Sequence, residues 1–291
     1  MDRRDFSRHL ATAAALSAIP EWARAQPPVK QPPVAPAHSH GGMGAFIDAL
    51  AAGDPAERAK ILPATWRNIA LVVYPGFFPL DLFGTKQVFD GLLNTNVHLV
   101  AKTREPVSAG RHVQLVPNHT FEDCPTGLDV LFLPGGGDGT VAAMKDPAMM
   151  AFLQRQAPSA RYVTSVCTGA LILGAAGLLK GYKATTHWVT HELLASLGAT
   201  PVKSRVVQDR NRITGGGVTA GIDFGLTIAA ALAGERYAKA LQLNIEYAPA
   251  PPFQAGEPDG AGPVITEALR GTYTSIVANA RAAAAGSVGA S

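Results

Sequence analysis

The chain has 291 residues, of which 47% are hydrophobic and 16% are charged, and its formal net charge is +3. This composition excludes a disordered or fibrous chain and supplies enough apolar residues for one sizeable core. The basic residues form no long run, so the charge gives no indication of nucleic-acid binding. Two cysteines, Cys124 and Cys167, are too few for a disulfide scaffold or a structural zinc site.

The amino terminus has the pattern of an export signal. Arg3 and Arg4 precede an apolar stretch from Leu10 to Pro20, and small residues at alternate positions end at Ala25. The sequence therefore predicts a twin-arginine signal over residues 1–25, cleavage after Ala25 and a mature protein in the periplasm. The alternative is an irregular helical start that is not a signal.

A proline-rich segment follows the expected signal. Over residues 26–67 the sequence predicts a tether, because prolines prevent helices and ladders, and then a short amphipathic helix from Phe46 to Ile61. His38 and His40 could ligate a metal, but no third ligand lies nearby. We therefore expect a solvated tail and no metal site there.

From residue 68 short apolar runs alternate with helical segments, which is typical of an α/β domain with a mainly parallel sheet and helices on both faces. We expect this domain over residues 68–262, and a C-terminal helix with a fraying tail over residues 263–291. The expected strands are Ile69–Tyr74, Val97–Ala101, Val130–Leu133, Tyr162–Val166, Val206–Val207 and Arg212–Thr214. The expected helices are Leu80–Leu92, Pro147–Gln156, Thr168–Leu178, Trp188–Leu197, Thr219–Ala233, Arg236–Tyr247 and Val264–Ala284, and His112–Val116 is expected to be a small antiparallel excursion.

The uncharged run from Tyr162 to Leu179 is formally long enough to span a bilayer. Its first half is rich in β-branched residues, whereas its second half is rich in Leu and Ala, as in a buried strand that leads into a buried helix. We therefore expect no membrane span in the mature chain.

The most informative motif places Cys167 between this strand and this helix, with Gly169 close behind. The pattern is typical of a nucleophile elbow, where the side chain points out of the carboxyl edge of the sheet and the helix end favours the thiolate. A buried inert cysteine is the alternative. Cys124 lies in a loop without this pattern, and a disulfide between the two cysteines would occupy the nucleophile.

A second motif follows the first expected strand, where Asp81 lies between Leu80 and Leu82 at the start of a helix. A carboxyl group in such apolar surroundings costs free energy to bury unless it caps the helix or performs acid–base chemistry. Asp81 and Cys167 both follow strands, so they would meet at the carboxyl edge of the sheet, where open α/β sheets place their sites. This convergence favours catalysis over a helix cap.

A glycine-rich run, Gly135–Gly139, follows another strand. Its spacing does not match G-x-G-x-x-G and no Walker lysine follows, which argues against nucleotide binding. The exposed amides of such a run can hold developing negative charge, so Gly136 and Gly137 are candidate oxyanion donors. His187 ends a short strand and is a candidate pocket residue, with a packed structural histidine as the alternative. We expect Asp223 to be structural.

Three segments resemble isonitrile hydratases of the ThiJ/PfpI superfamily, within the class I glutamine amidotransferase-like group. They are Tyr162–Trp188, Gly215–Ala230 and Leu241–Gly256, the last with the run Glu-Tyr-Ala-Pro-Ala-Pro-Pro-Phe. The resemblance implies a flavodoxin-like fold, a homodimer, no metal or organic cofactor, and a catalytic set of Asp81, Cys167 and Thr168.

The resemblance also implies the reaction, which is hydration of a small-molecule isonitrile to an N-substituted formamide. In this interpretation Cys167 adds to the isonitrile carbon, Asp81 delivers the proton and then activates water, and Thr168 orients the water or Asp81. Gly136 and the amide of Thr168 would hold developing charge.

Three features depart from the family pattern. Thr85 stands where a proline usually follows Asp-x-x-Gly, Thr168 stands where protease-like and amidase-like relatives have histidine, and the leader and tether are additions. Two alternatives share the elbow. One is a glyoxalase or thiol-based stress protein, which usually has a glutamate where this chain has Asp81. The other is a non-enzymatic ligand-sensing domain, which usually precedes a helix–turn–helix unit.

Overall fold

A computed structural model describes residues 43–110 and 112–288. The chain divides into two units, Met1–His40 and Gly41–Ser291, and the described residues all belong to the second. The expected signal over residues 1–25, most of the tether with His38 and His40, and the last three residues lie outside the described residues.

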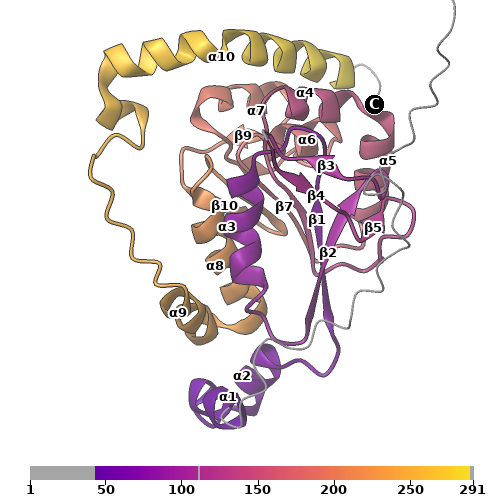
Figure 1. The fold of residues 1–291 in the computed structure, drawn as a ribbon, viewed down its shortest axis with the longest axis vertical. Coiled ribbons are helices and arrows are strands. Elements are labelled where there is room, and N and C mark those ends of the chain that lie inside the picture. The colour runs from indigo at the N-terminus through magenta and orange to yellow at the C-terminus, as the bar shows by residue number, and fades with distance from the viewer. Residues whose placement is uncertain (1–42, 111, 289–291) are drawn as a thin grey trace, which may run out of the picture. The chain divides into compact units, whose positions relative to one another are not determined.

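A seven-stranded sheet forms the centre of the described unit (Figure 1). Its order is β10-β11-β7-β6-β1-β2-β5, and only the pair of β10 and β11 is antiparallel. The strands are β1 (Arg67–Val72), β2 (Thr95–Ala101), β5 (His119–Thr120), β6 (Val130–Leu133), β7 (Tyr162–Val166), β10 (Val206–Asp209) and β11 (Arg212–Gly215). Apart from the short edge strand β5, the parallel strands β1, β2, β6, β7 and β11 follow in chain order the 2-1-3-4-5 flavodoxin-like arrangement. The expected mainly parallel α/β fold is confirmed.

Two smaller ladders flank this sheet. Strand β3 (Val107–Ser108) pairs antiparallel with β4 (Gln114–Leu115), which is the small excursion expected near residues 112–116. Strand β8 (Lys183–Ala184) pairs with β9 (Thr200–Pro201) in parallel.

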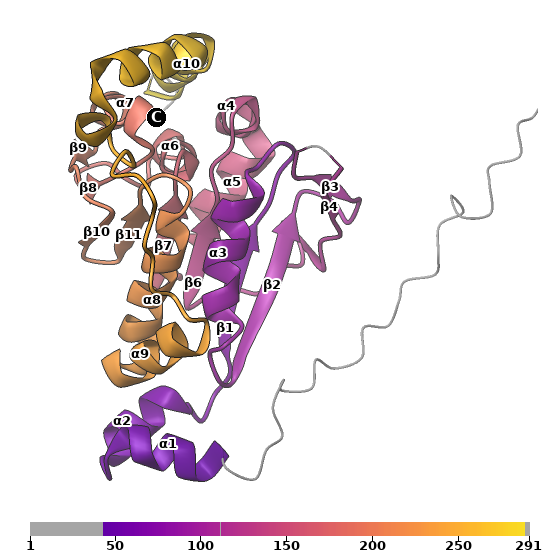
Figure 2. The same cartoon turned by 60° about the vertical axis from the view of Figure 1, so that its left-hand side comes forward.

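Helices surround the sheet, and α3 lies beside α8 in both ribbon views (Figures 1 and 2). The α-helices are α1 (Met43–Ala51), α2 (Pro55–Ile61), α3 (Pro79–Phe89), α4 (Asp138–Lys145), α5 (Pro147–Gln156), α6 (Gly169–Ala175), α7 (Leu193–Ser196), α8 (Ala220–Ala233), α9 (Glu235–Asn244) and α10 (Pro258–Val288). A 3₁₀ turn, η3, covers Trp188–Thr190. Because helices cover the central strands, β6 is buried at every position and β1 at all but one.

The single amphipathic helix expected from Phe46 to Ile61 is wrong. The structure has α1 and α2 instead, separated by a turn in which Gly53 has a φ of +78°. Asp54 then caps α2, because its side chain accepts a hydrogen bond from the amide of Ala56 at 2.8 Å, and Pro55 occupies the first helical position. Their inner face is buried through Ile47 and Ile61.

Two other expectations about helices were inaccurate. The continuous helix expected over Trp188–Leu197 is divided into η3 and α7, and α4 was not expected at all. Helix α4 begins directly after the glycine-rich turn and contains Gly139, and glycine is a weak helix former. Its packing against α5 and α6 outweighs that propensity.

The C-terminal helix is longer than expected. Helix α10 is broken at Gly262, where φ is +78°, just before Pro263. Ala280 and Ala284, toward its end, are buried, whereas the last three residues of the expected fraying tail lie outside the described residues. Helix α10 contacts α4, α6, α7 and η3, and Figure 1 shows it lying across this end of the fold.

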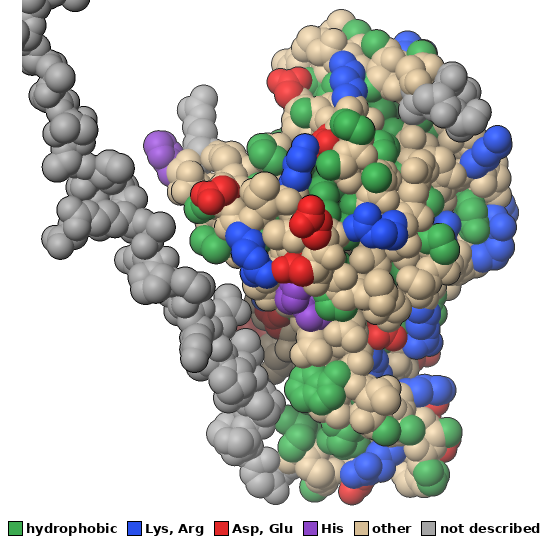
Figure 3. All heavy atoms as spheres, turned by 90° about the vertical axis from the view of Figure 1, so that its right-hand side faces the viewer, with side chains coloured by type: hydrophobic (Ala, Val, Ile, Leu, Met, Phe, Trp, Pro, Cys, Tyr) green, Lys and Arg blue, Asp and Glu red, His purple; other side chains and the backbone are tan. Residues whose placement is uncertain are grey.

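The uncharged run over residues 162–179 contains β7 and α6. Within the described ranges, no helix combines the length and apolar character that a membrane span requires. On the face shown in Figure 3, basic and acidic side chains are interspersed. Partly exposed ion pairs such as Lys102 with Asp146, at 3.0 Å, are each worth roughly 0–1 kcal/mol.

Candidate active site

The structure places Cys167 at the expected junction, between the end of β7 and the start of α6. Its φ is +57°, a left-handed conformation that costs a residue with a side chain roughly 1–2 kcal/mol. Three hydrogen bonds hold it there. The Cys167 amide donates to the carbonyls of Gly215 and Gly216 at 3.0 and 2.9 Å, and Thr186 Oγ1 donates to the Cys167 carbonyl at 2.8 Å.

Asp81 lies in the first turn of α3 and is fully buried. It does not cap the helix, since the capping position is Phe78 and no side chain caps it. One carboxyl oxygen, Oδ2, accepts a hydrogen bond from the amide of Gly135 at 2.8 Å, and the buried Oδ1 has no hydrogen-bond partner. The alternative of a helix cap is therefore excluded, and an unpartnered buried oxygen favours a protonated carboxyl group.

The electrostatics of the pair follow from this burial. Burial raises the pKa of Asp81 to about 7, although the Gly135 amide and the Cys167 thiol lower it. Burial also raises the pKa of the Cys167 thiol, and the charge on Asp81 raises it further, whereas the amides of Thr168 and Val218 favour the thiolate. The amide at the start of the helix thus lowers the pKa of the thiol as expected, but burial and the charge on Asp81 raise it by more. At neutral pH the pair carries at most one negative charge.

The departure at Thr85 leaves α3 intact. Thr85 Oγ1 lies 3.0 Å from the carbonyl of Asp81 and 3.2 Å from that of Gly221, and it is buried. The hydroxyl therefore connects the backbone of α3 at Asp81 with that of α8 at Gly221.

The glycine-rich loop contacts Asp81 and Thr168. A Cβ at Gly135 would lie 2.6 Å from the Thr168 nitrogen and 2.8 Å from Asp81 Oδ2, so only glycine fits. The Gly136 amide donates to Thr168 Oγ1 at 3.0 Å and is therefore already engaged in this arrangement. Thr168 Oγ1 also lies 2.8 Å from the Gly136 carbonyl and 2.8 Å from Thr140 Oγ1. Thr168 thus anchors the loop, while its amide faces the sulfur.

Sequence reasoning missed four residues of this neighbourhood: Gly135, Thr140, Thr186 and Val218. Gly135 belongs to the glycine-rich run in which Gly136 and Gly137 were the candidate residues, and Thr186 directly precedes His187. Both therefore adjoin residues that the sequence had identified as candidates. Thr140 and Val218 reach the site only through tertiary contacts.

His187 and Gly137 lie farther out. The His187 ring packs on Gly217, where a Cβ would be 2.5 Å from its Cδ2, and its centroid is 5.8 Å from that of Tyr273 in α10. Burial lowers the pKa of His187. Gly137 precedes α4, and a Cβ there would lie 3.7 Å from Ile276 Cδ1.

The remaining singled-out residues lie apart from the pair. Cys124 is buried, and its sulfur lies 3.6 Å from the Pro125 carbonyl; burial raises its pKa to about 11. Both cysteines are free, so the disulfide alternative does not occur. Asp223 binds Arg205 at 2.5 Å and Tyr247 at 3.0 Å. Across the described part of the chain, no three His, Cys, Asp or Glu side chains come together as metal ligands would.

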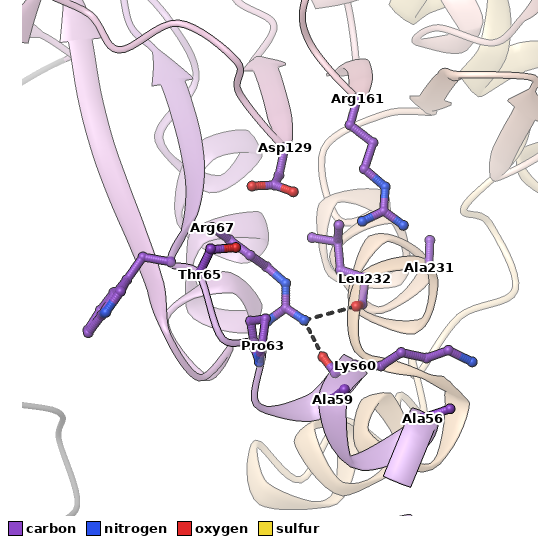
Figure 4. A pocket seen from close by; sticks show the side chains of 11 residues that line it. Ala56, Ala59, Lys60, Pro63, Thr65, Arg67, Asp129, Arg161, Ala231 and Leu232 are labelled. Carbon is purple, nitrogen blue, oxygen red and sulfur yellow. Dashed lines mark hydrogen bonds between the residues drawn. The ribbon is translucent and has the colours of Figure 1, made fainter.

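A cavity of about 350 Å³ lies where the central strands begin, whereas Cys167 follows the end of β7 (Figure 4). Arg67, at the start of β1, extends into it. Its guanidinium donates to the carbonyls of Leu93 and Leu232 at 3.1 and 3.0 Å and to that of Lys60. Arg67 therefore joins the ends of α2 and α8, and none of the candidate site residues lines this cavity.

Comparisons with known proteins identify the family. The model of the DJ-1/PfpI family matches residues 67–231. The isonitrile hydratase of Pseudomonas putida is 52% identical over 203 residues, which cover 70% of this chain and 88% of that protein. A ThiJ/PfpI family protein from Pseudomonas syringae aligns with a TM-score of 0.75 and 46% identity, covering 78% of this chain and 94% of that one. A DJ-1 superfamily protein from Salmonella typhimurium aligns with a TM-score of 0.55 and 26% identity, covering 62% and 99%. The resemblance seen in the sequence is confirmed, and the chain belongs to the DJ-1/PfpI family.

Proposed function

We propose that the protein hydrates isonitriles to N-substituted formamides, and is therefore a hydro-lyase. The observation that carries the proposal is the buried pair of Cys167 and Asp81 in a chain 52% identical to an isonitrile hydratase. The geometry fits the chemistry, because an isonitrile carbon needs a soft nucleophile and a proton at the same atom. Sulfur and carboxyl lie close enough to alter each other's pKa.

The first step forms a thioimidate. The Cys167 sulfur attacks the terminal carbon of R–N≡C, and that carbon receives the single proton shared by the Cys167–Asp81 pair. The product is R–N=CH–S–Cys167, with Asp81 left as the carboxylate. The raised pKa of Asp81 matters here, since a carboxyl group with a pKa of about 7 both holds and releases a proton near neutral pH.

The second step restores the enzyme. The Asp81 carboxylate accepts a proton from water as the water oxygen attacks the thioimidate carbon. The C–S bond then breaks, the nitrogen gains one proton, and the thiol of Cys167 is recovered. The sum is R–NC plus H₂O giving R–NH–CHO, with no oxidant, reductant or cofactor consumed.

Backbone amides assist the sulfur in both steps. The amides of Thr168 and Val218 favour negative charge on sulfur as the C–S bond forms and breaks. Thr168, through its hydroxyl, holds the Gly136 peptide group, and Gly135 brings an amide to Asp81. Thr168 is thus a positioning residue for the glycine loop in this proposal.

The decisive experiment is incubation of the purified protein with n-butyl isonitrile and detection of N-butylformamide by NMR. Water labelled with oxygen-18 should place the label in the formamide oxygen. A parallel incubation with methylglyoxal tests the glyoxalase alternative, for which lactate would be the product. Lactate without formamide would replace the hydratase by that alternative, and binding without either product would favour the ligand-sensing domain.

We also propose export by the twin-arginine route to the periplasm. The proposal rests on Arg3, Arg4 and the apolar stretch that follows them. A fusion of residues 1–30 to a folded reporter should leave the cytoplasm only when the twin-arginine translocase is intact. Changing both arginines to lysine should retain the reporter inside, and normal export of that variant would contradict the route.

A homodimer is the assembly that we propose. It is supported by the family resemblance and by apolar side chains that stay exposed on the described surface, including Val264 at 82%, Leu243 at 78% and Phe253 at 77%. Light scattering coupled to size-exclusion chromatography should give twice the mass of the mature chain. A monomer at micromolar concentration would contradict the proposal.

A further inference from the structure

The candidate reactive groups have almost no contact with solvent. Cys167 is 1% exposed and Asp81 is 0% exposed. A substrate must therefore pass between the elements that cover them. The loops after β6, β7 and β11 contact the pair, through the amides of Gly135, Thr168 and Val218.

Side chains of α10 approach the loop after β6 and the segment that follows β8. Ile276 Cδ1 approaches Gly137, where an added Cβ would be 3.7 Å away, and the same point lies 3.9 Å from Phe78 Cζ. Tyr273, one turn earlier, faces the His187 ring, with the centroids 5.8 Å apart. His187 in turn packs on Gly217, and the amide of the next residue, Val218, faces the sulfur.

The start and the end of α10 are attached to the fold differently. Residues 248–257 precede it as an exposed segment without helix or strand. Gly262 breaks the helix, and Thr266 ties its start only to the carbonyl of Pro258, within α10 itself. The buried alanines, Ala280, Ala283 and Ala284, lie in the second half. Ile276, which approaches the glycine loop, therefore lies between the break at Gly262 and the buried alanines.

We propose that α10 is the outer wall of the reaction chamber, and that Ile276 limits the size of the isonitrile substituent that reaches Cys167. The proposal rests on the proposed hydratase function. The isonitrile carbon must meet the sulfur, so the substituent on nitrogen extends outward, past the glycine loop and toward Ile276. Phe78 and Tyr273 form the apolar sides of this passage.

The test compares Ile276→Ala with Ile265→Ala, a matched control on the same helix whose side chain is 53% exposed. Ile276→Val is a second variant that removes only the Cδ1 methyl group. The measured quantity is the ratio of kcat/KM for 2-naphthyl isonitrile to that for methyl isonitrile. One methylene in an apolar pocket changes discrimination by about 10- to 200-fold, so we expect Ile276→Ala to raise the ratio by about tenfold or more. Ile276→Val should raise it less, and Ile265→Ala should leave it unchanged.

A second readout does not depend on isonitrile chemistry. In a Cys124→Ser background, Cys167 is alkylated with iodoacetamide or with the bulkier N-(1-pyrenyl)maleimide. Ile276→Ala should accelerate the bulky reagent selectively. The wild-type protein could hydrate no isonitrile while Ile276→Ala still raises the rate of the bulky reagent relative to iodoacetamide. That result would overturn the hydratase function and support α10 as the outer wall of the chamber around Cys167. If folded Ile276→Ala and Ile276→Val change neither ratio, the wall assignment is wrong.

Discussion

The surroundings of the two cysteines differ in ways that separate a reactive thiol from an inert one. Both Cys124 and Cys167 are buried and free, and burial raises the pKa of both thiols. Each also has an aspartate whose charge raises that pKa, Asp123 for Cys124 and Asp81 for Cys167. Burial, charge and thiol pKa alone do not distinguish the two positions.

Backbone geometry and the state of the neighbouring carboxyl group do distinguish them. Cys167 has a φ of +57° and faces two amides, whereas the Cys124 sulfur faces a carbonyl at 3.6 Å. Asp81 is fully buried with one unpartnered oxygen, whereas Asp123 is exposed and paired with Arg104. The comparison shows that a candidate nucleophile is recognised by a partner able to exchange its proton and by donors aimed at its sulfur.

The largest effect is expected from the cysteines themselves. Cys167→Ala should lower isonitrile turnover to about one ten-thousandth or less, as expected for loss of a nucleophile that acts together with its base. Cys124→Ser should leave isonitrile turnover nearly unchanged in the same assay. Thermal unfolding checks that both variants fold. Undiminished turnover by Cys167→Ala would remove covalent catalysis, and a large loss in a folded Cys124→Ser protein would point to the other thiol.

The aspartates give the next effect. Asp81→Asn keeps the size of the side chain but can neither deliver a proton nor activate water, so turnover should fall by about 100- to 10,000-fold. Asp123→Asn is the matched control beside the other cysteine and should keep wild-type activity. The measurement is kcat/KM for n-butyl isonitrile. An Asp81→Asn variant that retains most of its turnover would leave Asp81 without the acid–base role.

The elbow could be predicted from sequence because its determinants are local. A β-branched run, Cys167 and Gly169 lie within a few residues of one another, and the ends of β6 and β7 were placed correctly for the same reason. The pairing of Asp81 with Cys167 required only the rule that parallel strands end at one edge of a sheet.

The other contacts of the site depend on chain segments that meet only in the folded state. Gly135 and Asp81 are 54 positions apart, and Thr140 reaches Thr168 across 28. Nothing in the sequence of α10, which predicted a helix that ends in a fraying tail, indicates that Ile276 lies against Gly137. The direction of the Cys167 pKa was missed because burial, a property of the whole fold, outweighs the local helix end.

The dependence of activity on pH sharpens the comparison further. The active form of the Cys167–Asp81 pair holds one proton. Because the pKa of Asp81 is about 7, lowering the pH through this value adds a second proton to the pair and makes it inactive. Turnover should therefore rise about tenfold from pH 6 to pH 8, as expected for a single titrating base. The profile of kcat/KM for the wild-type protein measures this. A profile that is flat between these values would show that Asp81 does not titrate in the free enzyme.

A smaller effect is expected from the hydroxyl that anchors the glycine loop. Thr168→Val keeps the amide that faces the sulfur but removes the hydrogen bonds to Gly136 and Thr140, which should cost about 1 kcal/mol of stability. Because the loop also holds the amide of Gly135 against Asp81, kcat should fall by about tenfold while KM changes little. Thr168→Ser restores the hydroxyl and should recover most of the activity. Failure of Thr168→Ser to do so would show that the methyl group, not the hydroxyl, is needed.

The smallest effect is on stability, and it should have opposite signs for the two aspartates. Burial raises the folded pKa of Asp81 to about 7 from the unperturbed 3.8, so between these values the folded state binds more protons than the unfolded state. Stability therefore falls as the pH rises through this window, and Asp81→Asn, which does not titrate, avoids the loss.

We expect Asp81→Asn to raise the Tm at pH 8 by several degrees relative to wild type, and this gain to vanish toward pH 4. Asp123 behaves oppositely, because the Thr120 amide and Arg104 lower its pKa. The Asp123 carboxylate therefore stabilises the folded protein at pH values above its pKa in the unfolded chain, and this stabilisation is lost as the pH falls through its lower pKa in the folded protein. At pH 8 the stabilisation is present, so Asp123→Asn should lower the Tm there. Scanning calorimetry of both variants at pH 4 and pH 8 makes the measurement. If Asp81→Asn instead lowered the Tm at pH 8 as Asp123→Asn does, the Asp81 carboxylate would be a stabilising group, and its raised pKa, on which the proton-transfer role depends, would be refuted.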